Sequence, residues 1–518
     1  MAILGNLLKR GIRLRESLEQ DYASPFDLQK TELRKLLITA KDTYFGRYYY
    51  FKTILNGFKD QDQDLFYKYY KSNVPIHDYD SINNEWWSKS REGIKDVTWP
   101  GKVKYYALSS GTSGAPSKHI PVTKDILRSM QKTGVRQLLA LSKLEIDSKY
   151  YETDILMVGG STDLKFNGTY FEGDLSGITT SQIPIWLQRF YKPGKKIAKA
   201  PDWNSKLDEI VHRAKEWNVG VIVGVPAWIQ LLMEKIIAQY GVSTIHDIWP
   251  NLKIFVHGGV SFKPYKRGFE KLLAEPMFYM ETYLASEGFI AFQDKPEHSS
   301  MRLVLNNGIF YEFIPFTNRN FDMNGELNKN PETFKIDEVK EGIEYALLLS
   351  TNAGAWRYLI GDVIEFTNKK DVEIIIKGRT KHFLSLCGEH LSLDNMNEAL
   401  ELAANDLNIT VKEFTVCGES YESLFAHRWY IGTDDPVNKG RFRKLLDKYL
   451  MQLNDDYRVE RSAALKEIFI ELLPSEMFYS WMSSLGKAGG QHKFPRVLSG
   501  ERQKHWTDFL NSKRRVND

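Results

Sequence analysis

A loop rich in glycine and hydroxyl residues, closed by a lysine, is the strongest candidate for chemistry in the sequence. It lies within residues 105–122, between an apolar strand-like run and a helix-like run over 125–141. Gly111 and Gly114 let the backbone turn its N–H groups toward one centre, and hydroxyl groups add donors. The hydroxyl residues are Ser109, Ser110, Thr112, Ser113 and Ser117. Lys118 adds a positive charge, so the loop is predicted to bind phosphate or a developing oxyanion rather than to be a plain polar turn.

The spacing of this loop excludes two other chemistries. A Walker A loop has glycine directly before its lysine, whereas Ser117 precedes Lys118 here. A nucleophile elbow fails because Ala115 stands where the closing glycine belongs. The run Ser-Ser-Gly-Thr-Ser-Gly, followed by Lys118 and then Ile120-Pro121, resembles the phosphate loop of the adenylate-forming superfamily. Within that superfamily it is most similar to the plant Gretchen Hagen (auxin-responsive) acyl acid–amido synthetases and their bacterial relatives.

The resemblance implies a role for each residue of the loop that matches. Ser110 and Lys118 are assigned to catalysis. The residues assigned to the nucleotide are Ser109, Ser110, Gly111, Thr112 and Ser113.

A second constellation follows the strand-like run over 277–280. Tyr283, Ser286 and Glu287 offer a stacking face for a base, a phosphate donor and a ligand for a hard cation such as Mg²⁺. The alternative is an ordinary strand edge with one buried tyrosine and a solvated glutamate. The pattern Tyr-x-x-Ser-Glu resembles the family's second motif. That resemblance implies Tyr283 on the adenine, Ser286 near the phosphates and Glu287 on Mg²⁺.

A third constellation ends in Gly361-Asp362, before a strand predicted over 363–366. A carboxylate after glycine at a strand start can accept two hydrogen bonds from a ribose diol, although Gly-Asp is also a common turn. The family's pattern is Tyr-Arg-x-Gly-Asp. Here Tyr358 and Asp362 match, but Leu359 replaces the arginine, which puts any charge role there in doubt unless Arg357 compensates.

Three further positions complete the implied nucleotide site. Gly258-Gly259 resembles the glycine turn that passes along the other side of the adenine, and Arg379 is assigned to the nucleotide as well. Near the C-terminus, a glycine-rich basic stretch contains Gln-x-Lys-x-Pro-Arg around Lys493. An exposed loop is the plain interpretation. The resemblance implies that Lys493 contacts the ATP phosphates as a catalytic residue.

The elements that must position these residues alternate between short apolar runs and helical patterns, which indicates α/β layering. Strand-like runs over 155–158 and 254–256 end in glycine pairs, and a run over 221–225 ends at Pro226, ahead of a helix expected over 228–240. Strands that end this way place ligand-binding backbone at their carboxyl ends.

The polar run 377–381 is predicted to be a hinge between two domains. Residues 1–377 are expected to form an ATP- and acyl-acid-binding domain, and residues 378–518 a smaller mobile C-terminal domain of βαββαβ order. The predicted fold class is α/β, with a large N-terminal adenylate-forming domain (β-sheets flanked by helices plus a β-barrel-like part) and a C-terminal α+β domain. The expected C-terminal elements are strands over 383–386, 411–416, 426–431 and 468–472 and helices over 392–406 and 439–453.

Composition limits the other classes of function. The 518 residues include 70 Lys and Arg against 66 Asp and Glu, a net charge of +4 that is too even to indicate a nucleic-acid partner. No run of about 18 apolar residues predicts a membrane span. Helices are expected over 1–55. The two cysteines, Cys387 and Cys417, are typical of a reducing compartment, so a cytoplasmic protein is expected.

Three motifs in the expected order, together with the Val74-Pro75-Ile76 segment that resembles another family feature, predict an ATP- and Mg²⁺-dependent ligase. It would adenylate a carboxylic acid and transfer the acyl group to an amino acid or another amine. His119 and His257 are possible bases but are interpreted as structural. Thioester formation with coenzyme A and a non-catalytic nucleotide-binding protein remain alternatives. The acid, the amine and the oligomeric state are not predicted.

Overall fold

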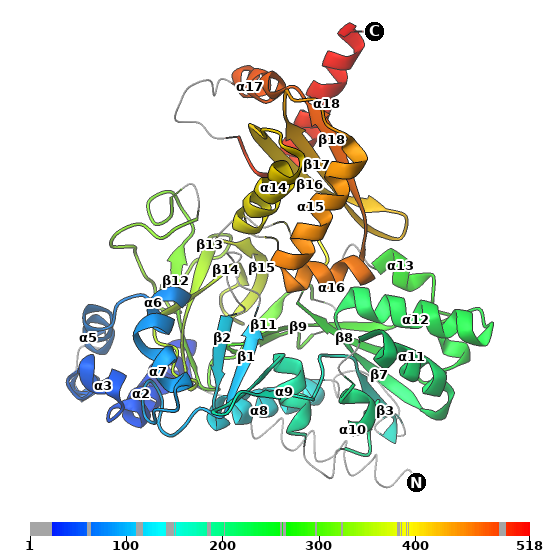
Figure 1. The fold of residues 1–518 in the computed structure, drawn as a ribbon. Coiled ribbons are helices and arrows are strands. Elements are labelled where there is room, and N and C mark those ends of the chain that lie inside the picture. Colours follow the sequence, from blue (N-terminus) through cyan, green and yellow to red (C-terminus); the bar gives the residue numbers. More distant parts are fainter. Residues whose placement is uncertain are drawn as a thin grey trace. The chain divides into compact units, whose positions relative to one another are not determined.

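The computed structural model contains two compact units (Figure 1). The first ends at Thr380 and the second begins at Lys381. The residues that the structure describes are 23–59, 64–109, 118–140, 150, 152–183, 188–200, 203–259, 262, 266–295, 298–322, 325–380, 384, 386–389, 391, 393–485 and 494–517.

The first unit is built on an eleven-stranded sheet, with strand order β12-β13-β14-β15-β11-β10-β9-β8-β7-β3-β6. Its strands from β6 to β9 are parallel, and those from β9 to β12 are antiparallel. The strands are β3 (Asp154–Met157), β6 (Tyr191–Lys192), β7 (Val219–Gly224), β8 (Ile254–Gly258), β9 (Phe278–Ala285), β10 (Gly288–Phe292), β11 (Met301–Leu303), β12 (Ile309–Pro315), β13 (Glu344–Thr351), β14 (Tyr358–Asn368) and β15 (Glu373–Arg379).

The parallel strands follow the predicted strand–helix alternation. Strand β7 is rich in valine and isoleucine and largely buried, as expected for a strand covered on both faces. The next helix, α12 (Pro226–Tyr240), begins with a proline whose fixed φ suits the first helical turn. It ends at Gly241, which adopts the left-handed φ of 61°. Figure 1 shows α12 and α11 (Trp203–Arg213) beside these strands.

The helices expected over 1–55 are confirmed from Pro25 onward. Helix α2 (Pro25–Ala40) is capped by Ser24, whose side chain accepts the N–H of Asp27. Gln29, buried on this helix, donates to the carbonyl of Ile309 at 3.0 Å and accepts the N–H of Tyr311 at 2.8 Å. These bonds attach the helix to β12. The other N-terminal helices are α3 (Tyr44–Tyr48), α4 (Phe51–Ile54), α5 (Leu65–Asn73), α6 (Tyr79–Ile82) and α7 (Ser88–Arg91).

A second, four-stranded sheet of order β2-β1-β5-β4 holds the two ends of the glycine and hydroxyl loop. Strands β1 (Tyr105–Ser109) and β2 (Lys118–Val122) form an antiparallel pair. Strand β2 leads into α8 (Lys124–Ala140), whose Ile126 N–H donates to the Thr123 hydroxyl at 3.1 Å. The predicted strand and helix around the loop are therefore confirmed, with an added short strand between loop and helix. The remaining strands are β4 (Lys165–Phe166) and β5 (Phe171–Gly173).

The second unit has a four-stranded sheet of order β18-β17-β16-β19 with helices beside it. The helices expected over 392–406 and 439–453 are confirmed as α14 and α15, but α16 was not predicted. Of the strand expected over 383–386, the described residues show one bridge, between Leu384 and Leu391. The elements are α14 (Leu393–Leu407), β16 (Glu413–Tyr421), β17 (Leu424–Gly432), α15 (Lys439–Leu453), α16 (Asp455–Ala463), β18 (Leu465–Leu473), α17 (Ser475–Ser484), β19 (Val497–Leu498) and α18 (Gly500–Asn517).

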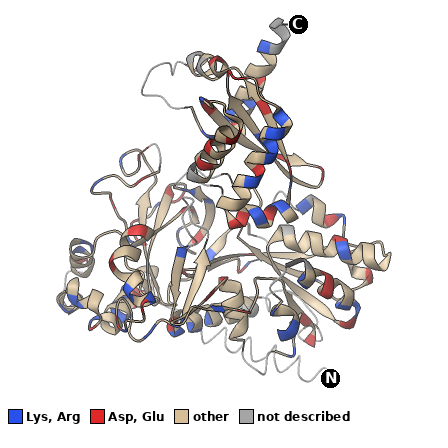
Figure 2. Cartoon of the chain, in the orientation of Figure 1, with Lys and Arg blue, Asp and Glu red and all other residues tan. Residues whose placement is uncertain are grey.

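Acidic and basic residues are interspersed over the elements of both units (Figure 2), in keeping with the near-balanced charge. Within the described ranges, no helix is both long and apolar enough to cross a membrane.

Candidate functional site

The loop that opens the candidate site closes a β-hairpin. Ser109 and Lys118 are Cα partners at the end of the β1–β2 ladder, so the backbone fixes both ends of the loop. Residues 110–117 lie outside the described part of the chain, and with them Ser110, Gly111, Thr112 and Ser113. Their predicted phosphate contacts stay predictions.

Lys118 lies over the ring of Tyr79, with its Nζ 5.3 Å from the ring centroid. The next residue, His119, donates its backbone N–H to the Tyr79 hydroxyl at 2.9 Å. The His119 ring lies 3.2 Å from the Oε2 of Glu172 through its Nε2, so it pairs within the small sheet. This contact supports the structural interpretation of His119.

The second predicted motif forms the hairpin between β9 and β10. Tyr283 lies within β9, which continues to Ala285 rather than ending near Met280 as expected. Ser286 and Glu287 form the two-residue turn. Ser286 is half-buried, whereas Glu287 is only 8% exposed, which contradicts the alternative of a solvated glutamate.

The third motif meets the second at Asp362. The Tyr283 hydroxyl donates to Oδ2 of Asp362, and the Nε of Arg379 lies 3.1 Å from Oδ1. Asp362 lies inside β14 rather than at a strand start, because pairing of β14 with β13 begins already at Tyr358. Arg379 is its Cα partner on β15, so the sheet register brings the two charges together.

Glu287 has charged neighbours from the other predicted motifs. Burial raises the pKa of Glu287 to about 6; its own backbone N–H opposes this, Asp362 adds to it, and Lys118 and Arg379 oppose it. Burial also raises the pKa of Tyr358, with Glu287 adding to the rise and Arg379 opposing it. Glu287 is thus within electrostatic reach of Lys118, Asp362 and Arg379.

Glycine is favoured at both positions of the pair after β8, for a different structural reason at each. A Cβ on Gly258 would lie 2.4 Å from the carbonyl oxygen of Thr282, so close packing of β8 on β9 requires glycine there. Gly259 has a φ of 83°, a conformation that favours glycine. The neighbouring His257 is buried, and burial lowers its pKa to about 4, so its ring is neutral at pH 7.

Arg357 does not replace the arginine that the third motif lacks. Its guanidinium is buried and pairs with Glu312 at 2.9 Å, and it also donates to the carbonyl of Val74 at 2.9 Å. Leu359 packs beside the buried cluster that contains Ile314. The positive charge beside Asp362 therefore comes from Arg379, which is one β-ladder pair away rather than adjacent in sequence.

The residues of this site fit a magnesium ion that takes few of its ligands from the protein. The described residues contain no group of three His, Cys, Asp or Glu side chains that could hold a metal by themselves. Glu287 is a carboxylate whose pKa is raised by burial, which Lys118 and Arg379 only partly offset. Mg²⁺ commonly takes one or two carboxylates and completes its shell with water and substrate phosphates, so Glu287 fits as a protein ligand.

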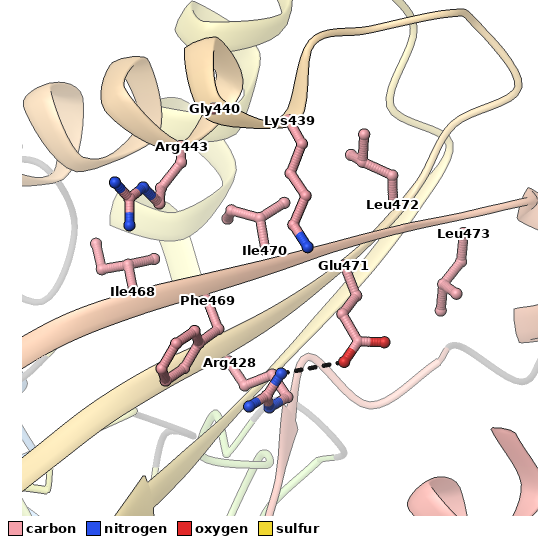
Figure 3. Close-up of a pocket in the computed structure, with 10 residues that line it drawn as sticks. All are labelled: Arg428, Lys439, Gly440, Arg443, Ile468, Phe469, Ile470, Glu471, Leu472 and Leu473. Carbon is pink, nitrogen blue, oxygen red and sulfur yellow. Dashed lines mark hydrogen bonds and ion pairs between the residues drawn. The ribbon is translucent and has the colours of Figure 1, made fainter. Parts of the chain in front are cut away.

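A separate hollow of about 630 Å³ lies in the second unit, along β18 and the start of α15 (Figure 3). Among the residues that the structure describes, no predicted site residue lines it. Its arginines are already paired, Arg428 with Glu471 at 3.1 Å and Arg443 with Glu467 at 2.8 Å. Lys493 lies outside the described residues, so its predicted contact with phosphate stays a prediction.

Sequence reasoning missed Tyr79 as a site residue. It ends the segment from Asn73 that includes Val74-Pro75-Ile76, which resembles a family feature but was given no role at the site. Its place directly ahead of the loop in the sequence was a signal, but only the pairing of β2 reveals its contact with Lys118.

Family models match most of the chain in three parts. They are described as GH3 family N-terminal domain, over residues 14–207, GH3 family central domain, over 302–372, and GH3 family C-terminal domain, over 394–502.

Curated relatives match over shorter stretches. A probable indole-3-acetic acid-amido synthetase GH3.9 of Oryza sativa subsp. japonica is 24% identical over 210 residues, which cover 38% of this chain and 45% of the relative. A jasmonoyl–L-amino acid synthetase JAR6 of Nicotiana attenuata is 27% identical over 181 residues, 33% of this chain and 30% of the relative. The matches thus span less than half the length of these relatives.

Solved structures match over nearly the whole chain. The GH3.15 acyl acid amido synthetase has a TM-score of 0.57 at 17% identity and covers 97% of this chain and 96% of its own. A 2-hydroxyisobutyryl-CoA ligase in complex with 2-HIB-AMP and CoA has a TM-score of 0.58 at 13% identity and covers 95% and 93%. These likenesses confirm the predicted fold class.

Proposed function

Because the chain belongs to the GH3 family, as its three matched domain models establish, we propose that it is an ATP-dependent acyl acid–amido synthetase. One observation carries the proposal. The Tyr283 hydroxyl of the second motif donates to Asp362 of the third, and Glu287 is within electrostatic reach of Lys118 and Asp362, although these residues are far apart in sequence. A fold alone hosts many functions, so this convergence is the stronger support.

The proposed reaction has two steps. A carboxylate oxygen attacks the α-phosphorus of ATP, an acyl-adenylate forms, and pyrophosphate leaves. An amine nitrogen then attacks the acyl carbon, loses a proton, and displaces AMP to give an amide. Adenylation is needed because a free carboxylate has no good leaving group. No enzyme nucleophile is required, which agrees with the burial of the Cys387 and Cys417 thiols.

We assign different described residues to the phosphates, the ribose and the adenine of ATP. We assign Lys118 to charge on the phosphates, Asp362 to the ribose hydroxyls, and Tyr283 with Gly258-Gly259 to the adenine. Ser109 and Ser286 supply donors near the phosphates, and Arg379 orients Asp362 through its ion pair. Glu287 would hold Mg²⁺, which when bound would neutralise phosphate charge as it redistributes.

The decisive experiment is acid-dependent exchange of pyrophosphate into ATP, with a panel of aliphatic and aromatic carboxylic acids. We expect exchange with at least one acid and none without acid. The matched variant is Asp362→Ala, which should abolish exchange and weaken ATP binding by about 2–4 kcal/mol, since charge-assisted hydrogen bonds to the ribose are lost. Unchanged ATP affinity in calorimetry would remove the assignment of Asp362.

Product analysis decides the acceptor. The enzyme, ATP and the active acid are incubated with a mixture of amino acids in one arm and coenzyme A in the other. The family membership favours an amide product. A thioester with no amide would replace the proposal with an acyl-CoA ligase, and ATP binding without exchange would favour a non-catalytic nucleotide-binding protein.

The C-terminal lysine has its own test. Lys493→Ala should slow adenylation by on the order of 10²-fold, as removal of a preorganised charge does. It should spare amide formation from chemically supplied acyl-adenylate, because pyrophosphate has already left in that step. An equal loss in both half-reactions would make Lys493 a structural residue and remove the support for a mobile domain after residue 377.

A further inference from the structure

Tyr79 lies between two elements that carry predicted site residues. It opens α6, where the N-cap Asp78 accepts the N–H of Ser81 and fixes the turn. Two residues earlier, His77 donates its N–H to the Arg357 carbonyl at 2.9 Å and accepts the Leu359 N–H at 2.8 Å. The segment is therefore attached to the start of β14.

On its other side, Tyr79 contacts the start of β2. Its ring face lies 5.3 Å from the Nζ of Lys118, and its hydroxyl oxygen accepts the His119 N–H at 2.9 Å. The ring is supported by Trp87, whose centroid is 6.2 Å away. Two separate contacts, one to a side chain and one to the backbone, thus fix consecutive residues of β2.

The position of Lys118 matters because its charge is what the phosphate would meet. Its ammonium lies over an aromatic face, which attracts cations. A lysine has four rotatable side-chain bonds and loses rotamer freedom when it is held in one place. A pre-placed ammonium would meet phosphate without that loss at the moment of reaction.

We propose that Tyr79 is a positioning residue, which holds the Lys118 ammonium over its ring face and fixes the end of the loop through its hydroxyl. This inference rests on the proposed function, because it assigns Tyr79 to the same adenylation site. It touches no reacting atom and acts through Lys118.

The test compares two substitutions that differ in the ring. Tyr79→Phe keeps the aromatic face and loses the hydroxyl, whereas Tyr79→Leu loses both. In pyrophosphate exchange we expect Tyr79→Leu to lower kcat by about ten-fold with little change in the KM for the acid, and Tyr79→Phe to stay within about three-fold of wild type.

The matched control is Tyr240→Leu. Tyr240 lies at the far end of α12, carries the Lys215 ammonium 4.3 Å from its ring centroid, and donates its hydroxyl to the His212 carbonyl at 2.7 Å. Its loss should lower thermal stability about as much as that of Tyr79 without lowering kcat. An equal fall in kcat for both leucine variants at matched stability would make Tyr79 a structural residue and overturn the inference.

A second measurement needs no activity. The full-length protein is treated with limiting trinitrobenzenesulfonate, and modification of Lys118 and Lys215 is followed by peptide mapping. We expect Tyr79→Leu to raise the rate at Lys118 several-fold relative to Lys215, and Tyr79→Phe to match wild type. Equal Lys118 rates in all three proteins, or a phenylalanine variant as reactive as the leucine variant, would overturn the role of the ring. Wild-type protein without exchange for any acid would refute the proposed function, while the labelling would still decide the role of Tyr79.

Discussion

Two buried glutamates, one in each unit, have opposite surroundings. Glu287 in the β9–β10 turn is 8% exposed, and burial raises its pKa to about 6. Glu389 in the second unit is fully buried. Burial alone would raise its pKa too, but His427 and the backbone N–H groups of Cys387 and Leu386 outweigh this and hold the pKa well below its usual value.

The two carboxylates differ in the hydrogen bonds and positive charges that the protein places around them. Glu389 accepts the Leu386 and Cys387 N–H groups at 2.9 Å and lies 2.8 Å from the Nε2 of His427. Its bonds close the loop that it belongs to, so its role is structural. For Glu287, Lys118 and Arg379 only partly offset burial and the charge of Asp362. A carboxylate buried with too little positive charge is suited to a ligand that brings that charge.

The largest effect should come from removing the charge of Glu287. Glu287→Gln should lower pyrophosphate exchange by on the order of 10³-fold and abolish its response to magnesium, because an amide is a far poorer ligand for a hard cation. Magnesium titration of the exchange rate measures this. A variant with the wild-type magnesium response would place the metal elsewhere and break the contrast with Glu389.

Glu389→Gln should instead act on stability. It leaves His427 and the backbone donors with a neutral partner, which should cost about 2–4 kcal/mol in the free energy of unfolding of the second unit. Urea unfolding followed by hydrogen exchange of the β16 and β17 amides checks this. The magnesium response of the folded variant should be retained, and its loss would show that Glu389 also serves the reaction.

The pH dependence of stability should have opposite signs for the two residues. Because the pKa of Glu287 is higher in the folded protein, this carboxyl group stabilises the fold at pH values below about 4.5. The contribution is lost as the pH rises through about 6. Over that range wild type should lose about 2 kcal/mol relative to Glu287→Gln, because the carboxyl pKa rises from 4.5 to about 6 on folding. For Glu389 the contribution is present above pH 4.5 and lost as pH falls below it. Unfolding free energies of wild type and both variants at several pH values decide this, and parallel profiles would contradict it.

The sequence predicted more of the fold than of the geometry of the site. Local signals sufficed for α12, where Pro226 and Gly241 mark both ends, and for the β-branched strand β7. They failed at Asp362 because a Gly-Asp pair looks like a strand start, whereas Gly361 keeps its φ of 91° inside β14. They also missed α16, which has few apolar residues to mark it.

The site residues were found by pattern, but their contacts depend on register between distant strands. That Arg379 pairs with Asp362 follows from the β14–β15 ladder, and no local motif encodes it. That Arg357 is committed to Glu312 depends on β12 and α5, which lie far away in sequence. The sequence left this arginine as a possible substitute because adjacency in sequence does not tell which face of a strand a side chain takes.

Asp362 is intermediate between the two glutamates in how far protein donors occupy its oxygens. The smallest effect that we expect tests this comparison. One of its oxygens accepts the Tyr283 hydroxyl and the other faces Arg379, yet a carboxylate has lone pairs left for a ribose. Tyr283→Phe removes one protein donor and keeps the ring for the adenine, so the Kd for ATP should rise by only about five-fold, near 1 kcal/mol.

The control is Tyr311→Phe, which removes the hydroxyl of another buried tyrosine that donates to the Ile290 carbonyl at 3.3 Å. Calorimetry should show an unchanged Kd for the control. A Tyr283→Phe affinity as low as that of Asp362→Ala would mean that Asp362 needs its protein donors as completely as Glu389 does, and that its role is structural rather than ligand binding.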